Sequence, residues 1–210
     1  SASCSGPVDH RWHVRRPRRG ARGTLRRPRA GSVAALGIGN ERFPVVDEND
    51  RILRYARRSD VHGNNLRHRA VHILIFDQAG EVYLQQRSRW KDRYPLKWDS
   101  SAAGHVAAGE SYEETARREL KEELGINVPL DKLLELSASA RTEQEFVWLY
   151  RGNVRGTLII NRSEIETGAF FPPAIIDGWV SARPENFAPG FMECWKAYRG
   201  KKGVNGGTLT

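Results

Sequence analysis

A glutamate-rich segment bounded by glycines, residues 104–126, constrains the fold of this chain more than any other feature. It reads GHVAAGESYEETARRELKEELGI. Ser111 and Glu114 form a capping box and Gly125 supplies a stop, so the pattern predicts a helix of about thirteen residues between them. The predicted core face of this helix carries apolar residues at helical spacing: Ala116, Leu120 and Leu124.

Three carboxylates crowd together on this predicted helix. Like charges three or four residues apart cost a helix a few tenths of a kcal/mol each, roughly. At about 100° per residue, Glu119, Glu122 and Glu123 fall within an arc of about 100° that borders the apolar stripe. Two interpretations follow, an ordinary solvated helix face or a cation site at the rim of the core.

The spacing of the residues around the glutamates favours the cation site. Gly104, five residues, Glu110, seven residues and then Arg118-Glu119-Leu120-x-Glu122-Glu123-x-Gly125-Ile126 fit a Nudix box at every fixed position. From average residue usage such a match arises by chance on the order of once in 10⁷ chains of this length. The chain therefore resembles the Nudix hydrolase superfamily. The resemblance implies an α/β/α sandwich with a mixed β-sheet and the catalytic helix packed at its edge.

The chemistry of the resemblance agrees with the crowded carboxylates. Hydrolysis of a diphosphate brings water to phosphorus while negative charge builds on oxygen, and a hard cation lowers that cost. Mg²⁺ suits the task because it binds a few carboxylates and keeps water and phosphate as its other ligands. The resemblance thus implies that Glu119, Glu122 and Glu123 coordinate Mg²⁺ or Mn²⁺, with Glu119 also a candidate to orient or deprotonate water.

The other fixed positions of the box receive supporting roles from the same resemblance. Arg118 would hold the glutamates by ion pairing, and Gly104 and Gly109 would shape the loop before the helix. Glu110 is expected to be structural, as is Gly125 at the end of the helix. The expected activity is that of a pyrophosphohydrolase on a small-molecule diphosphate, for example a nucleoside diphosphate linked to another group.

Outside the box, residues 42–200 look most like the branch related to isopentenyl diphosphate isomerase. The segments that carry this likeness are LRHRAVHILIF, QQRSRWKDRYPLKWD, AAGHVAAGE and TEQEFVWLY. Those isomerases need a cysteine immediately before the Gly-His of the loop, where this chain has Ala103, whose methyl group cannot move a proton. They also usually have a degraded box, whereas this chain keeps every acid. Both departures favour hydrolysis.

A second metal site is the open question that the isomerase likeness raises. His62, His68, His105, Glu143 and Glu145 lie near the positions where isomerases hold one, and a His/Glu set can bind Mn²⁺ or Zn²⁺. The plainer interpretation makes His62 and His68 loop and strand-edge residues, His105 a loop hydrogen bonder and the glutamates solvated. We favour this plainer interpretation, without a metal, for His62 and His68. For Glu145 we expect a further metal ligand or base, ahead of Glu143.

Basic and aromatic residues before the box are candidates for substrate contacts. Arg87 and Lys91 occupy positions that contact the diphosphate in the isomerase relatives. The alternative, that both are charged residues at a strand end that face water, has equal weight. Trp90, Tyr94 and Trp98 could stack on a base, although aromatic residues at this density are more often packed in a core or at its rim.

The net charge of +9 belongs to one end of the chain. Residues 1–39 contain nine arginines and one acid, which is +8 and leaves +1 for the rest. We expect a disordered tail at 1–39, a Nudix domain at 40–202 and a flexible end at 203–210. Nucleic-acid binding is expected only through the N-terminal tail, which could also be a targeting arm; we favour an unselected extension.

The remaining composition sets the expected surroundings of the protein. Two cysteines make no disulfide framework, so we expect a cytoplasmic setting, with organelle targeting by the tail left open. No apolar run approaches the roughly 20 residues that span a bilayer, so no membrane partner is expected. A monomer or a homodimer is expected.

Short apolar runs predict the strands of the sheet. FPVVDENDRILRY predicts a hairpin, and residues 71–76 and 82–86 predict two strands around a turn. Residues 145–152 and 157–161 predict two more strands, and the chain after Pro172-Pro173 predicts helices. The order of elements therefore indicates a mixed sheet with helices packed on it.

Overall fold

Strand β3 (His68–Phe76) lies at the centre of the fold, as its nearly continuous apolar sequence predicts. The computed structural model describes residues 41–204, so the expectation for 1–39 lies outside the described residues, as does that for 203–210 except at 203–204, which end a helix. Seven strands form the main sheet in the order β5-β4-β3-β8-β7, with β6 also paired to β3 and β9 to β4. The other six strands are β4 (Val82–Arg87), β5 (Trp98–Asp99), β6 (Ala102–His105), β7 (Leu130–Leu136), β8 (Glu145–Asn153) and β9 (Ile165–Phe171). Strand β3 runs parallel to β8 and antiparallel to β4 and β6, so the sheet is mixed.

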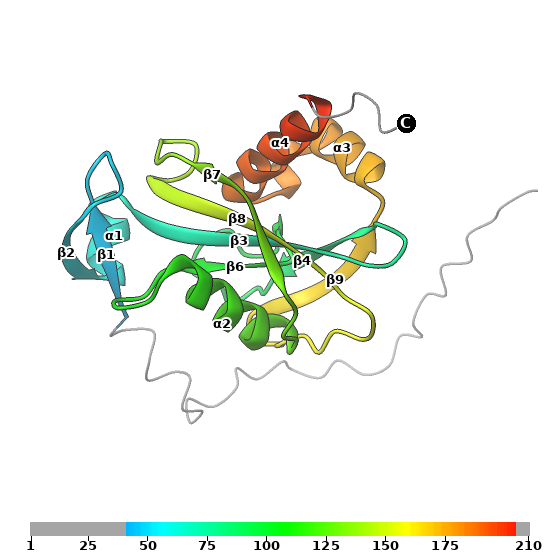
Figure 1. Cartoon of the computed structure of the whole chain (residues 1–210), viewed down its shortest axis with the longest axis horizontal. Helices are drawn as coiled ribbons and strands as arrows, with labels where there is room; N and C mark the ends of the chain where they lie inside the picture. The colour runs from blue at the N-terminus through cyan, green and yellow to red at the C-terminus, as the bar shows by residue number, and fades with distance from the viewer. Residues whose placement is uncertain (1–40, 205–210) are drawn as a thin grey trace, which may run out of the picture.

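Helices cover both faces of this sheet (Figure 1). Helix α2 (Tyr112–Leu124) packs on one face, and α3 (Pro173–Ala182) and α4 (Pro189–Val204) pack on the other, joined by the short 3₁₀ helix η2 (Pro184–Asn186). Alternate residues of β3 supply the two cores. Val71, Ile73 and Ile75 pack with α2, whereas Ala70, Leu74 and Phe76 pack with α4. The expected α/β/α sandwich is confirmed.

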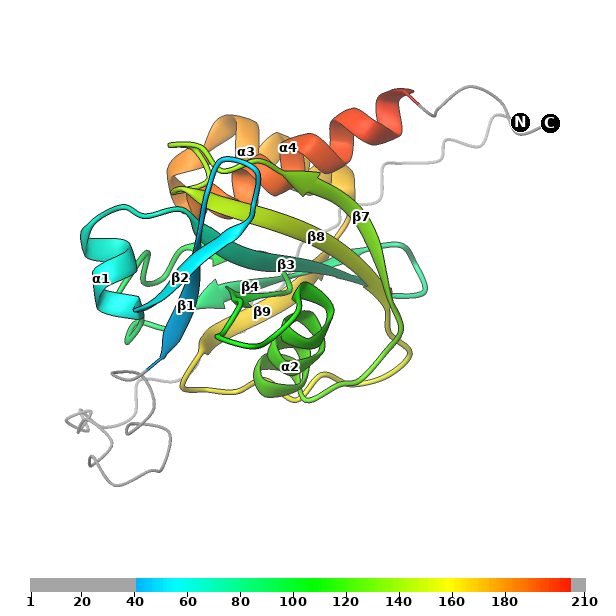
Figure 2. The ribbon, with the colours of Figure 1, turned by 60° about the vertical axis from the view of Figure 1, so that its left-hand side comes forward.

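A small unit stands at one end of the sandwich (Figure 2). It contains the antiparallel pair β1 (Arg42–Val46) and β2 (Ile52–Arg57), followed by the short helix α1 (Arg58–Gly63). The predicted hairpin is therefore confirmed. Phe43, Val45 and Val61 form a core of its own within this unit.

The capping residues predicted for α2 are present. The Ser111 hydroxyl accepts a hydrogen bond from the Glu114 backbone N–H at 3.2 Å, and the Glu114 carboxylate accepts one from the Ser111 N–H at 2.8 Å. Gly125 follows the last turn at φ +68°, the left-handed conformation that favours glycine. The helix therefore starts and ends where the sequence indicates.

The Ser111→Ala variant should lose about 1 kcal/mol of unfolding free energy, because an alanine N-cap leaves a first-turn N–H without its acceptor. Urea unfolding followed by circular dichroism measures this loss. Ser163→Ala, at an exposed hydroxyl in the loop before β9, is the matched control. Equal stability of Ser111→Ala and the wild type would contradict the expected role of the cap.

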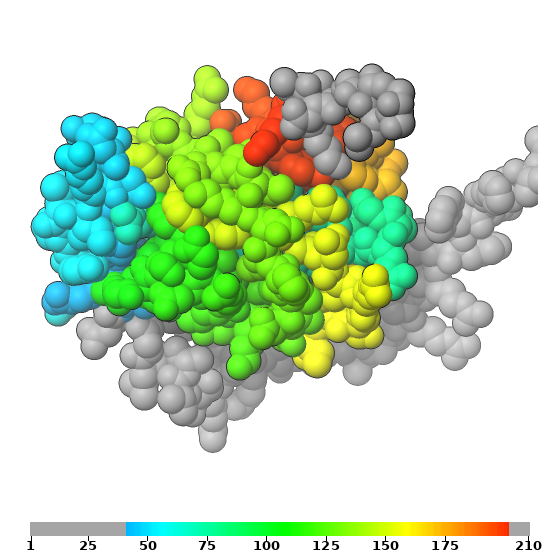
Figure 3. All heavy atoms as spheres, viewed as in Figure 1, coloured from blue at the N-terminus to red at the C-terminus, as the bar shows by residue number. Residues whose placement is uncertain are grey.

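Two details of the sheet differ from the sequence prediction. Residues 157–161 are not a strand; instead, Ile159 N–H donates to the Leu124 carbonyl and Asn161 N–H to the Glu123 carbonyl, each at 2.9 Å. This segment therefore donates hydrogen bonds to carbonyls at the end of α2 that have no partner within the helix. It lies on the same face of the molecule as α2 (Figure 3). The strand comes later, as β9. Strands β3 and β4 also diverge after one paired position, Phe76 with Val82.

Among residues 41–204, no helix is both long and apolar enough to cross a lipid bilayer.

Candidate active site

The predicted helix face and the loops around it line one large cavity of about 1150 Å³. The cavity extends from the C-terminal half of α2, past β6, to the start of α4. Charged and polar side chains from seven elements and their loops meet in it. They include Arg58, His62, His72, Arg87, Lys91, Asp99, His105, Arg118, Glu119, Glu122, Glu123, Glu143, Glu145 and Glu164.

The three box glutamates differ in their exposure to solvent. Glu123 is 3% exposed and the Glu119 side chain 14%, whereas the Glu122 side chain is 55% exposed at the rim. Burial raises the pKa of Glu119 and of Glu123, and the nearby Arg118 and Lys91 offset this only in part. Two buried carboxylates without enough positive charge are a donor set that fits a divalent cation.

Arg118 forms ion pairs with two of the three glutamates that the resemblance assigns to it, Glu119 and Glu122, and with Glu110 rather than Glu123. Its Nη1 donates to Glu119 Oε1 at 2.8 Å and to Glu122 Oε2 at 3.2 Å, and its Nε donates to Glu110 Oε1 at 2.8 Å. Glu110 also accepts from the Thr115 hydroxyl at 2.7 Å. The guanidinium thus connects the loop before α2 to the helix and fixes the orientation of two cavity carboxylates.

Gly104 lies directly against Glu119. A Cβ atom at position 104 would stand 2.0 Å from Glu119 Oε1, so no other residue fits without displacing that carboxylate. Gly109 has a φ of +88°, which an L side chain rarely adopts. Both glycines therefore shape the loop, one by close approach and the other by its backbone conformation.

Gln85, in β4, is a buried neighbour of Glu123 that the sequence analysis did not single out. Its Nε2 donates to Glu123 Oε2 at 2.8 Å, and the Ala103 N–H donates to the same oxygen at 3.3 Å. Among residues 41–204, the other Glu123 oxygen, Oε1, accepts no hydrogen bond. The signal that could have identified Gln85 is a polar residue at a buried position of an apolar strand.

The basic residues before the box are already paired with protein groups. Arg87 donates from Nε and Nη2 to the Arg93 carbonyl, at 3.2 and 3.1 Å, and from Nη1 to Asp99 Oδ2 at 3.0 Å. Lys91 forms an ion pair with Glu164, an acid that the sequence analysis did not consider. Lys91 and Glu164 line the cavity beside the glutamates, whereas most of the donors of Arg87 are engaged.

The three candidate stacking residues have different surroundings. Trp90 lines the cavity and is 54% exposed. Tyr94 donates its hydroxyl to Glu143, and Trp98 packs edge-on against Phe171 and Trp179. Trp98 is thus a packing residue, and Trp90 is the aromatic ring left open to a ligand.

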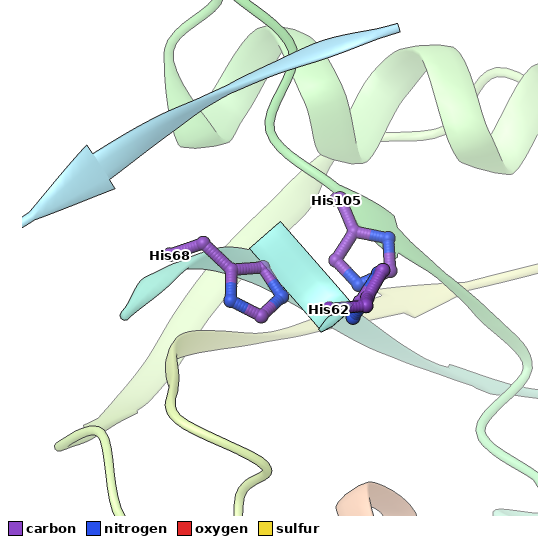
Figure 4. A group of neighbouring side chains, drawn as sticks. All are labelled: His62, His68 and His105. Atoms are coloured by element: carbon purple, nitrogen blue, oxygen red, sulfur yellow. The ribbon is translucent and has the colours of Figure 1, made fainter. Parts of the chain in front are cut away.

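Three histidines from separate elements converge beside the cavity (Figure 4). His62 comes from α1, His68 from the start of β3 and His105 from the end of β6, and their candidate ligand nitrogens lie within 4.8 Å of one another. The plainer interpretation is corrected for the position of His62 only, since His68 is the first residue of β3, at the strand end as expected. His62 lies in a helix rather than a loop, and His68 is buried because Phe43 of the β1–β2 unit stacks on its ring.

Two of these histidines are neutral, and two nitrogens of the cluster lack a hydrogen-bond partner in the described part of the chain, as a metal site requires. Burial, reinforced by the neighbouring histidines, lowers the pKa of His62 to about 3, and burial lowers the pKa of His105 to about 4. Both rings are therefore neutral at pH 7, the form that ligates metals. The Nε2 atoms of His62 and His68 are buried without a hydrogen-bond partner in the described part of the chain.

Glu145 belongs to this histidine cluster. His105 Nε2 lies 3.1 Å and His68 Nε2 3.5 Å from Glu145 Oε1, and Glu145 is the register partner of His68 across β3 and β8. Glu143 instead accepts from Arg93 and Tyr94. Glu145, which we expected to be a further metal ligand or base, thus contacts the histidines, which makes it a fourth candidate ligand of their site.

Comparison with known proteins agrees with the resemblance. A family model described as NUDIX domain matches residues 66–191. An uncharacterized Nudix hydrolase of Streptomyces coelicolor is 33% identical over 81% of this chain and 95% of its own length. An isopentenyl-diphosphate Delta-isomerase of Nocardia farcinica is 32% identical over 71% of this chain and 89% of its own length. The crystal structure of DR0079 from Deinococcus radiodurans has a TM-score of 0.62 and 29% identity, covering 68% of this chain and 90% of that one.

Proposed function

Because the chain belongs to the Nudix family, we propose that it is a Mg²⁺- or Mn²⁺-dependent hydrolase that cleaves the diphosphate linkage of a nucleoside diphosphate joined to another group, or of a related organic pyrophosphate. General pyrophosphohydrolase activity follows from the family. The observation that supports the finer proposal is the meeting of Glu119, Glu122 and Glu123 in a single cavity, two of them buried with raised pKa values.

The reaction has requirements that these side chains could meet. Water adds to one phosphorus while the bridging P–O bond breaks, so a proton must leave the water and charge must be stabilised on the departing phosphate. A divalent cation held by the three glutamates supplies Lewis-acid polarisation of phosphate oxygens and makes a nearby water more acidic. Glu119 is our candidate to take the proton, since Arg118 and the space at Gly104 fix the position of its carboxylate.

Lys91 and Trp90 are the proposed contacts of the substrate at the rim. Lys91 can exchange its ion pair with Glu164 for a phosphate oxygen, and Trp90 offers an exposed ring to a base or sugar. Arg87 has a smaller part in this proposal than the sequence suggested, because the Arg93 carbonyl and Asp99 occupy three of its nitrogens.

A panel of diphosphates tests the proposed function. Nucleotide sugars, dinucleoside polyphosphates, nucleoside triphosphates, NADH and prenyl diphosphates would each be incubated with Mg²⁺ and with Mn²⁺. We expect cleavage into two phosphorylated products for at least one member, dependent on the cation. Absence of cleavage across the panel with both cations would contradict the proposal.

Isomerisation of isopentenyl diphosphate is the second candidate, suggested by the likeness to the Nocardia isomerase. It ranks lower because Ala103 lies where those enzymes carry the required thiol. Formation of dimethylallyl diphosphate from isopentenyl diphosphate would support it, and we expect none.

We also propose that His62, His68, His105 and Glu145 hold a second metal ion, Mn²⁺ or Zn²⁺, as neutral imidazoles with one carboxylate can. The His62→Ala/His105→Ala variant should bind one equivalent of metal fewer than the wild type. Equilibrium dialysis with metal analysis measures this, and Glu122→Gln/Glu123→Gln should lose the other ion independently. Equal metal content in the wild type and the double histidine variant would contradict a second site.

The expected nucleic-acid binding by the N-terminal tail concerns residues 1–39, which lie outside the described residues. If it binds RNA through its arginines, deletion of residues 1–39 should abolish an affinity that falls steeply with salt.

A further inference from the structure

His72 is a buried imidazole in the cavity that neither the box nor the histidine cluster uses. It lies in the middle of β3 at 5% exposure, between Val71 and Ile73, which pack in the apolar core. Burying a polar ring there is costly unless its nitrogens are satisfied. One of the two nitrogens, Nδ1, has a hydrogen-bond partner, because it lies 2.7 Å from Ser100 Oγ. The same nitrogen lies 3.7 Å from Asp99 Oδ1. Its Nε2 makes no hydrogen bond within residues 41–204.

The position of Asp99 favours the tautomer of His72 that carries its proton on Nδ1. This buried carboxylate is held in place by the Ser100 N–H at 2.8 Å on Oδ1 and by Arg87 Nη1 at 3.0 Å on Oδ2. A fixed negative charge next to Nδ1 stabilises a proton there, in a bond toward Ser100 Oγ. The lone pair of Nε2 is then left to accept a hydrogen bond.

Nε2 lies at the cavity wall, close to small residues at the start of α4. A Cβ atom at Gly190, near the start of α4, would lie 3.0 Å from Nε2, and Ala188 and Gly190 line the cavity there. The register partner of His72 on β6 is Ala103, whose own N–H binds Glu123. The imidazole lies on the face of β3 that packs against α4, whereas the glutamates lie on the α2 side. His72 and the glutamates nevertheless line the same cavity, so a molecule bound at the glutamates can extend through it to Nε2.

We propose that His72 recognises the organic part of the substrate: its Nε2 accepts a hydrogen bond from a hydroxyl or N–H group on the moiety attached to the diphosphate. The inference rests on the proposed function and narrows it to polar moieties such as sugars or nucleosides. A hydrocarbon chain would leave Nε2 buried without a partner, a loss that selects against prenyl diphosphates.

Three variants test this contact. His72→Leu removes the acceptor, and His72→Gln restores an amide near the position of Nε2. Gly190→Ala keeps the imidazole and its bond to Ser100 but places a methyl group against Nε2. For the hydroxyl-bearing substrate that the wild type cleaves, we expect His72→Leu and Gly190→Ala to raise KM about tenfold or more, with kcat within about threefold, since a factor of ten is about 1.4 kcal/mol.

The controls separate recognition from folding and from catalysis. Inhibition by methylenediphosphonate, a diphosphate analogue without an organic group, should stay within about twofold in all variants, and His72→Gln should regain most of the wild-type KM. An unchanged KM in His72→Leu, an equal loss of methylenediphosphonate affinity, or a wild type that cleaves only prenyl diphosphates would overturn the inference.

Failure of the proposed function would look different. If the wild type cleaves no diphosphate, calorimetry of α,β-methylene-ADP binding in the presence of Mn²⁺ tests whether His72 contacts the ligand. Weaker binding by His72→Leu than by the wild type would uphold the contact without hydrolysis, and equal binding would overturn it.

Discussion

The Glu122→Gln/Glu123→Gln variant should lose hydrolysis almost completely, with kcat reduced by about 10³-fold or more. Two ligands of the proposed cation are neutral in this variant, and loss of about 4 kcal/mol of charge stabilisation corresponds to that factor. The thermal stability of the variant should not fall with its activity. Glu123 is buried and its pKa is raised by burial, so a neutral amide costs less to bury and the melting temperature should hold or rise.

This opposite movement of activity and stability distinguishes a functional site from a structural one. Steady-state hydrolysis with Mg²⁺ and Mn²⁺, together with calorimetric melting, would measure both quantities. Glu113→Gln is the matched control, because Glu113 is an exposed acid in the first turn of the same helix, and its kcat should stay within about twofold of the wild type. Full turnover by the double variant would refute the assignment of these carboxylates.

The Gly104→Ala variant should lose about a hundredfold in kcat, although it adds a single methyl group. That methyl would lie 2.0 Å from Glu119 Oε1, so the carboxylate must turn away from its bond with Arg118 Nη1. Displacement of a reacting group by about 1 Å lowers the rate by a factor of about 100. The shift should remain local, because the moving atoms are the end of one side chain.

Gly178→Ala in α3 is the control for this glycine, since no atom lies within 4 Å of a Cβ at that position. Its activity should be unchanged and its stability slightly higher, as expected for alanine in a helix. Should Gly104→Ala keep wild-type kcat, Glu119 would not need its observed position, and its candidacy as the proton acceptor would fail.

Local sequence rules predicted the helix of the site well because its signals are short-range. Ser111, Glu114 and Gly125 define its ends through contacts within a few residues, and the apolar stripe defines its buried face. The sandwich and its mixed sheet followed from the order of apolar runs and from the resemblance. Residues 157–161 were predicted to form a strand, but the N–H groups of this apolar run bind carbonyls at the end of α2, a tertiary contact that no local rule contains.

The parts of the site that the sequence left open depend on register and on long-range packing. His68 meets Glu145 because β3 and β8 run parallel, and Phe43, from another unit, stacks on two of the three histidines. No spacing in the sequence encodes these neighbours. The same holds for Gln85 on Glu123, which meets its partner across the interface of β4 and α2.

The central claim is that a divalent cation sits among Glu119, Glu122 and Glu123, and crystals soaked with Mn²⁺ and a non-hydrolysable diphosphate test it most directly. Anomalous diffraction from manganese should show a peak within bonding distance of these carboxylates and of a phosphate oxygen. A bound diphosphate with no anomalous signal at the three glutamates, under conditions in which the protein hydrolyses its substrate, would contradict the claim.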